Sequence, residues 1–171
     1  MSIRDEIIRC VEADPPRLTL LRPALPGTRM KRFIFVAREI LSLLDGPWEN
    51  LELEIRWKHV RADLERFVGG GMIVVGTNGY MKPLDPAEDE IWEIRCIDPD
   101  PSVRIFGSFA EKDVFVSLGY RYRQDLEGKD SSEWAEVVRA CTADWRKLFL
   151  TYPPHSGSDL HDYISDPVVY L

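Results

Sequence analysis

The sequence predicts an α+β fold in which an N-terminal helical hairpin and a C-terminal helix pack on a small antiparallel β-sheet. Apolar residues recur at the 3.6-residue period of amphipathic helices over residues 28–67 and again over 131–148. Between these segments, residues 91–123 alternate between apolar and polar side chains, which is the period of β-strands. Short loops join the strand segments, and short connections between consecutive strands produce antiparallel pairing.

The first 27 residues are predicted to form a short helix and an extended arm. Ser2 and Asp5 have the spacing of a capping box, which marks the start of a helix. The helix is expected to end at Asp14, because a residue that precedes proline is disfavoured in the α conformation. Residues 17–26 then combine leucines with prolines, which is typical of an extended arm that crosses an apolar surface.

Residues 28–150 form the predicted main domain, which begins with the helical hairpin. The first helix is predicted over 28–44, and a Gly-Pro pair separates it from the second helix. In the second helix Arg56 is expected on the solvent side, and the three glycines at 69–71 end the helix. The apolar stripe of this second helix consists of Leu53, Trp57, Val60, Leu64 and Phe67.

Three strands, a helix and a tail complete the predicted chain. The strands are expected over residues 91–97, 103–110 and 114–123. The helix is expected to start at the capping residues that follow Asp130. Residues 151–171 combine turn-forming residues with scattered aromatic ones, so we expect a C-terminal tail that packs loosely.

One face of the predicted meander is rich in arginine. Side chains alternate along a strand, so four arginines are expected opposite the core: Arg95, Arg104, Arg121 and Arg123. Arginine suits phosphate groups geometrically, and Phe106 and Phe115 beside it offer rings that stack on bases. The alternative is an ordinary solvated sheet face, on which Glu93 and the acidic loops pair with the arginines.

Three strand motifs carry a family resemblance: Ile91-Trp92-Glu93-Ile94-Arg95, Val103-Arg104-Ile105-Phe106 and Val116-Ser117-Leu118-Gly119-Tyr120-Arg121-Tyr122-Arg123. Preceded by a predicted helical hairpin, they resemble the RelE/ParE toxin superfamily, and in particular its HigB-like branch. The resemblance covers about residues 28–150, and Glu93 matches a glutamate of the HigB-like branch. It implies a RelE-like α+β fold.

The resemblance also implies a function, that of a ribosome-dependent mRNA endoribonuclease, the toxin of a toxin–antitoxin system. In this superfamily, basic residues of the sheet grip mRNA in the ribosomal A site and assist attack of a ribose 2′-hydroxyl on the adjacent phosphate. By the resemblance, Arg104 and Arg121 are catalytic. Arg95 and Arg123 then bind RNA on either side. The implied partners are a cognate antitoxin and mRNA on the ribosome, and no cofactor is implied.

Charge favours a second interpretation, a non-catalytic domain of the same fold that binds a protein partner. The chain has a net charge of −7, which divides into +1 over residues 1–85 and −8 over residues 86–171. RNA-binding proteins are usually basic, because the release of counterions from phosphates supplies much of their affinity. The acidic balance therefore favours protein binding, whereas the arginine face favours the toxin.

Composition predicts a cytoplasmic protein that neither enters a membrane nor binds metal. The apolar runs are far shorter than the ~20 residues of a membrane helix, and the N-terminus lacks an export signal. Three scattered cysteines indicate a reducing compartment. His155 and His161, with two nearby aspartates, match no standard zinc spacing, so the sequence predicts no metal site.

Overall fold

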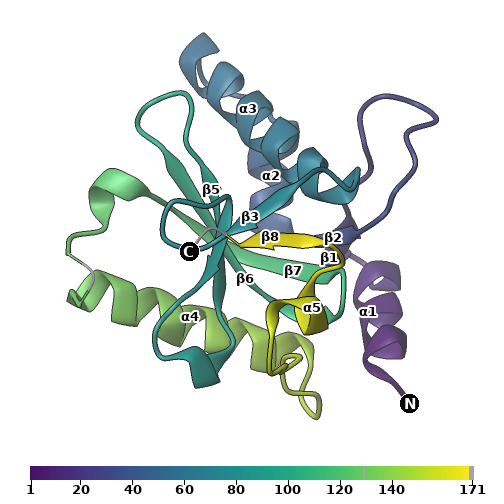
Figure 1. The fold of residues 1–171 in the computed structure, drawn as a ribbon. Helices are drawn as coiled ribbons and strands as arrows, with labels where there is room; N and C mark the ends of the chain where they lie inside the picture. The colour runs from purple at the N-terminus through teal and green to yellow at the C-terminus, as the bar shows by residue number, and fades with distance from the viewer. Residues whose placement is uncertain (129, 170–171) are drawn as a thin grey trace.

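An eight-stranded mixed β-sheet organises the computed structural model, which describes residues 1–128 and 130–169 (Figure 1). The strand order is β1-β2-β7-β6-β5-β4-β3-β8, so the two ends of the chain supply the two edges of the sheet. The strands are β1 (Leu18–Leu20), β2 (Phe33–Ala37), β3 (Ile73–Val75), β4 (Met81–Pro83), β5 (Trp92–Cys96), β6 (Val103–Glu111), β7 (Val114–Tyr122) and β8 (Pro167–Val169).

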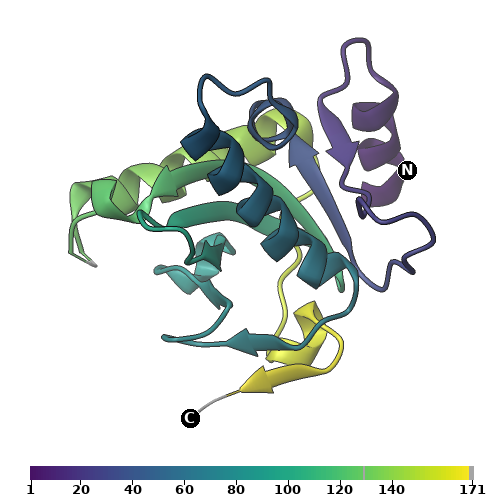
Figure 2. The same ribbon diagram turned by 90° about the horizontal axis from the view of Figure 1, so that it is seen from above.

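Helices cover both faces of this sheet (Figure 2). The helices are α1 (Ile3–Glu12), α2 (Arg38–Asp45), α3 (Leu51–Val68), α4 (Ser132–Leu148) and α5 (Leu160–Tyr163), with short 3₁₀ turns η1 (Ala87–Asp89) and η2 (Arg123–Asp125). One apolar core lies between the sheet and α2 and α3, and includes Trp57 and Leu64. A second core lies on the opposite face under α1 and α4, and includes Cys10 and Trp145.

The predicted small sheet beneath an N-terminal helical hairpin is wrong, although the α+β character is confirmed. Within the segment predicted as the first helix, Phe33–Ala37 forms strand β2, and only Arg38–Asp45 is helical. Strand β2 pairs in parallel with β7, and Ile34 and Val36 are fully buried. Aromatic and β-branched residues favour the pleated surface of a sheet, and this preference prevails over the helical spacing of the apolar residues.

Several predicted elements are confirmed. The capping box of Ser2 and Asp5 begins α1, and α3 ends at the predicted glycines. Strands β5, β6 and β7 form the predicted antiparallel meander. Arg56, however, is buried rather than solvent-facing, and it packs against the loop before β6.

The predicted loose packing of the C-terminal segment is also wrong. Tyr163 and Ile164 are buried in the core under α3, and Tyr163 packs against Trp92 with ring centroids 4.9 Å apart. Strand β8 pairs in parallel with β3, and the Ser165 backbone N–H donates to Asp113 over 2.8 Å. The segment therefore completes the sheet and one of its cores.

Membrane insertion by a helix finds no support in the part of the chain that is described. Within residues 1–128 and 130–169, no helix combines the length and the apolar character that a membrane span requires.

Candidate anion-binding site

The strand register aligns three of the predicted site residues across the sheet. Arg95 on β5 lies directly opposite Arg104 on β6, and Arg104 lies directly opposite Arg121 on β7. Residues that lie opposite one another in an antiparallel pair project from the same face. These three arginines therefore share the face on which α4 packs, as their alternation in the sequence predicts.

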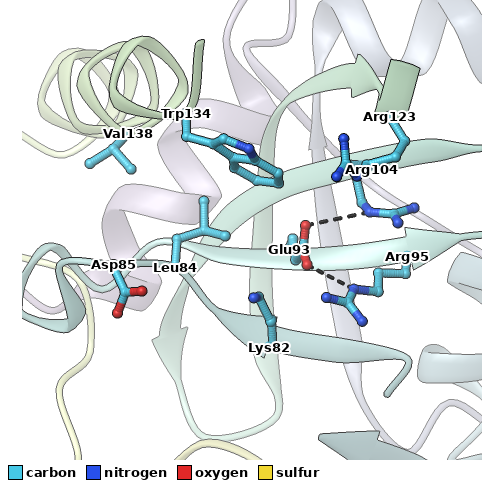
Figure 3. Close-up of a pocket in the computed structure, with 9 residues that line it drawn as sticks. All are labelled: Lys82, Leu84, Asp85, Glu93, Arg95, Arg104, Arg123, Trp134 and Val138. Atoms are coloured by element: carbon cyan, nitrogen blue, oxygen red, sulfur yellow. Dashed lines mark hydrogen bonds and ion pairs between the residues drawn. The ribbon is translucent and has the colours of Figure 1, made fainter. Parts of the chain in front are cut away.

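A pocket of about 180 Å³ lies on this face between the meander and α4 (Figure 3). Strands β4, β5 and β6 supply its floor, α4 supplies one wall, and the chain after β7 supplies another. Charged side chains dominate one end and apolar side chains the other. The lining residues are Lys82, Leu84, Asp85, Glu93, Arg95, Arg104, Arg123, Trp134 and Val138.

Glu93 lies at the centre of the pocket and is 1% exposed. The Arg95 Nε–H donates to Glu93 Oε1 over 2.8 Å, and Arg104 Nε lies 3.5 Å from Oε2 (Figure 3). Within the described residues, Oε2 accepts no hydrogen bond that meets geometric criteria. A buried carboxylate oxygen without a full set of donors retains the capacity to accept a proton or a hydrogen bond from a ligand.

Cations outnumber anions around this carboxylate. Lys82, Arg95, Arg104 and Arg123 face Glu93, with Asp85 at the rim. Burial lowers the pKa of Arg104, the charge of Glu93 opposes this change, and the charges of Arg95 and Arg123 add to it. Arg104 thus lies partly desolvated among like charges. An anion that enters the pocket would relieve that repulsion and would find guanidinium groups that suit phosphate oxygens.

Loop groups hold the pocket arginines in place. Arg95 donates to the Thr77 carbonyl, Arg123 donates to the Leu126 carbonyl, and Arg104 Nη1 donates to Ser102 Oγ over 3.2 Å. Within residues 1–128 and 130–169, the Nη2 groups of the three arginines make no hydrogen bond. Each guanidinium therefore keeps free donors for a ligand while its position is fixed.

Arg121 lies apart from this pocket even though its backbone lies opposite Arg104. Its side chain is exposed, its Nη1 donates to the Tyr120 carbonyl over 2.6 Å, and it lines a separate hollow with Cys141. Helix α4 buries Val137 and Val138 against the sheet, and these neighbours line different hollows. The predicted catalytic pair is thus aligned in register but does not share one pocket.

The two phenylalanines expected beside the arginines are inaccessible. Phe106 is 1% exposed and lies under Trp134, with ring centroids 6.0 Å apart. Phe115 points to the opposite core, where its ring centroid lies 5.2 Å from that of Phe109. The cause is a bulge in β7: Leu118 has no partner between Ser117 and Gly119, so the alternation reverses there. Neither ring is available to stack on a base in this structure.

The sequence did not identify five residues of the pocket. Lys82 lies on β4, a strand that was not predicted, directly opposite Glu93. Leu84 and Asp85 follow this strand, and Trp134 and Val138 lie on α4, a helix that the sequence predicts without linking it to the arginines. Only the alternation of Met81, which is buried, with Lys82 offered a signal for this strand. The proximity of α4 to the arginines had no sequence signal.

Comparison of the chain with protein-family models, with curated proteins and with solved structures finds no match in any of the three. The resemblance to the RelE/ParE superfamily stays a prediction, and it rests on the strand motifs within residues 91–123.

Proposed function

We propose that the pocket around Glu93 binds a phosphate group of RNA and that the chain is a RelE/HigB-like mRNA endoribonuclease that acts on the ribosome. One observation carries this proposal: in a pocket of about 180 Å³, two guanidinium groups pair with a single buried carboxylate, and a third guanidinium group and one ammonium group line the same pocket. This combination supplies both charge stabilisation for a phosphate and a proton acceptor beside it. As such a toxin, the chain would act in the cytoplasm, and a cognate antitoxin would neutralise it.

The proposed reaction is attack of a ribose 2′-oxygen on the adjacent phosphorus. Glu93 Oε2 accepts the proton of the 2′-hydroxyl as the new O–P bond forms. The bond from phosphorus to the 5′-oxygen breaks, that oxygen takes a proton from water, and a 2′,3′-cyclic phosphate remains. Arg104, Arg95 and Arg123 stabilise the negative charge that grows on the phosphoryl oxygens. Arg121, in its separate hollow, binds a neighbouring phosphate of the RNA.

The acidic total charge limits where RNA approaches. The pocket gathers one lysine and three arginines around Glu93, whereas residues 86–171 as a whole have a net charge of −8. Few phosphate contacts then contribute to affinity, so binding should depend only weakly on salt compared with a basic RNA-binding protein.

Two substitutions in the pocket test the proposal with opposite expectations. Arg104→Gln should weaken binding of a fluorescent RNA oligonucleotide and lower the cleavage rate on programmed ribosomes by about 10²–10³-fold. Glu93→Gln should also abolish cleavage, but it should tighten RNA binding, because it removes the negative charge at the centre of the pocket. Arg9→Gln is the matched control, since Arg9 is exposed on α1, contacts Glu6 and does not line the pocket.

The result that contradicts the proposal is equally specific. If the folded protein leaves mRNA intact on ribosomes, and Arg104→Gln binds RNA as well as the Arg9→Gln control does, the pocket has no role in RNA binding. The non-catalytic, protein-binding alternative would then be the better account of the chain.

A further inference from the structure

A larger hollow adjoins the arginine pocket along α4. This second hollow has a volume of about 610 Å³ and shares Asp85, Trp134 and Val138 with the pocket. Helix α4 forms one wall, and the connection between β4 and β5, which includes Pro86 and Asp89, forms the other. Because the two hollows share these three lining residues, they adjoin one another, and we call the pair the α4 cleft.

The two ends of the α4 cleft differ in size and chemistry. Ligand-binding clefts usually measure about 300–1,000 Å³, so the end at 610 Å³ can hold a ring system, whereas the end at 180 Å³ holds only a small group. The small end is cationic. The large end has an apolar floor of Pro86, Ala135 and Val138, and its charged lining is mixed, with the carboxylates of Asp89 and Asp130 and the guanidinium groups of Arg139 and Arg146.

Trp134 lines both ends, and Figure 3 shows its indole beside the smaller pocket. Its indole contacts the buried Phe106 ring edge-on at 6.0 Å, and its Nε1–H donates to the Glu127 carbonyl over 3.2 Å. The ring is therefore fixed in orientation while it still lines both hollows. A fixed aromatic ring next to an anion site is the usual arrangement for stacking a nucleobase beside its phosphate.

We propose that the α4 cleft binds one nucleotide, with its phosphate among Arg95, Arg104 and Arg123 and a guanine base stacked on Trp134 in the larger hollow. The inference rests on the proposed function for its phosphate end and adds the base end. Guanine is favoured because its N1–H and 2-amino group both donate hydrogen bonds, and ionised carboxylates such as Asp89 and Asp130 only accept them. Uracil presents a single N–H donor and leaves the second acceptor without a partner.

Calorimetric titration of the wild-type chain with 3′-GMP, 3′-IMP, 3′-UMP and inorganic phosphate tests this proposal. 3′-GMP should bind at least about tenfold more tightly than inorganic phosphate, which is the contribution of one stacked base. It should also bind more tightly than 3′-IMP, which lacks the 2-amino group, and than 3′-UMP. Asp89→Asn should reduce the preference for 3′-GMP over 3′-IMP.

A second variant separates the base end from the phosphate end without removing a packed ring. Ala135 is exposed on α4 and lines only the larger hollow, so Ala135→Gln narrows that hollow and leaves the arginines unchanged. It should lower the affinity for 3′-GMP to about that for inorganic phosphate, with phosphate binding unaltered. Ala62→Gln is the matched control, because Ala62 is also exposed on a long helix and lines neither hollow.

The outcomes distinguish the two proposals. If inorganic phosphate binds and Arg104→Gln weakens it, but 3′-GMP binds no better than phosphate or is unaffected by Ala135→Gln, the nucleotide inference alone is overturned. If neither phosphate nor any nucleotide binds, the proposed function is overturned together with it.

Discussion

Two sets of arginines are largely removed from solvent in this fold, and they differ in what their guanidinium groups contact. Arg32 and Arg56 are 4% and 3% exposed and lie on the side of α3. Arg32 donates to the carbonyls of Phe67, Gly71 and Ser165 over 2.9–3.2 Å. Arg56 donates to three consecutive residues of the loop before β6: Pro99, Asp100 and Pro101. Both guanidinium groups therefore connect segments of the chain that are distant in the sequence.

The pocket arginines are used differently. The Arg95 and Arg104 side chains keep 14% and 12% of their surface exposed, and their main partner is a carboxylate that they share. In the first set both Nη groups of each arginine donate to backbone carbonyls, whereas in the second set the Nη2 groups make no hydrogen bond within the described residues and line a cavity. Burial of an arginine is therefore no sign of function by itself. What distinguishes the pocket is the number of donors that remain unused.

Removal of the C-terminal segment should give the largest loss of stability, because it removes a hydrogen-bond partner of Arg32 and exposes one of the two apolar cores. Truncation after Pro154 deletes Tyr163 and Ile164 from the core, and with them the Ser165 carbonyl that accepts from Arg32. We expect the truncated chain to lose its cooperative thermal transition, measured by circular dichroism. An unchanged melting temperature would show that the segment does not stabilise the fold.

The next largest effect is expected for Arg32→Met. The substitution removes the ion pair of Asp113, at 3.5 Å, and the guanidinium donor of three carbonyls, of which that of Phe67 keeps its hydrogen bond from the Gly70 N–H. Loss of one partner from a buried pair costs about 3–5 kcal/mol, so the free energy of unfolding in urea should fall by that amount. Arg29→Met is the control at an exposed position and should change the free energy of unfolding little. A loss below about 1 kcal/mol for Arg32→Met would remove the contrast between the two sets.

Arg104→Met should cost far less stability than Arg32→Met. Glu93 keeps its hydrogen bond from Arg95, and water in the pocket can replace Arg104 at Ser102 Oγ. A net contribution of about 1 kcal/mol or less to the free energy of unfolding is expected, from the same urea titration. A loss as large as that of Arg32→Met would mean that Arg104 holds the fold together, and the phosphate-binding proposal would lose its basis.

The meander could be predicted from the sequence because its strands and turns depend on residues that are close together in the chain. Strands β5, β6 and β7 alternate clearly, and short loops leave antiparallel pairing as the simple solution. The shared face of the arginines followed from the same alternation. Phe115 was misplaced because a single bulge at Leu118 reverses the alternation within β7, and no composition signal marks that residue.

The errors concern contacts between distant parts of the chain. Ile34 and Val36 belong to a strand only because β7, some eighty residues later, pairs with it in parallel. Tyr163 becomes a core residue only when β8 joins β3. The pocket has the same origin, since Trp134 meets the arginines through the placement of α4 across the sheet. Side-chain periodicity encodes none of these pairings.

The smallest expected effect concerns the reactivity of Cys141 on α4. Burial and the charge of a neighbouring arginine change the pKa of its thiol in opposite directions, just as burial and the charge of Glu93 change the pKa of Arg104 in opposite directions. Burial raises the pKa of the Cys141 thiol to about 12, Asp144 adds to the increase, and Arg121 opposes it. Because the folded pKa lies above the unfolded value of 9.0, the contribution of this thiol to stability is complete below pH 9 and is lost as the pH rises towards 12.

At pH 8 only about one Cys141 thiol in ten thousand is a thiolate, so native Cys141 should react very slowly with iodoacetamide and much faster in denaturant. Mass spectrometry of the labelled peptide measures the rate of this reaction. Rapid labelling of Cys141 in the folded protein at pH 8 would show that the charge of Arg121 outweighs burial.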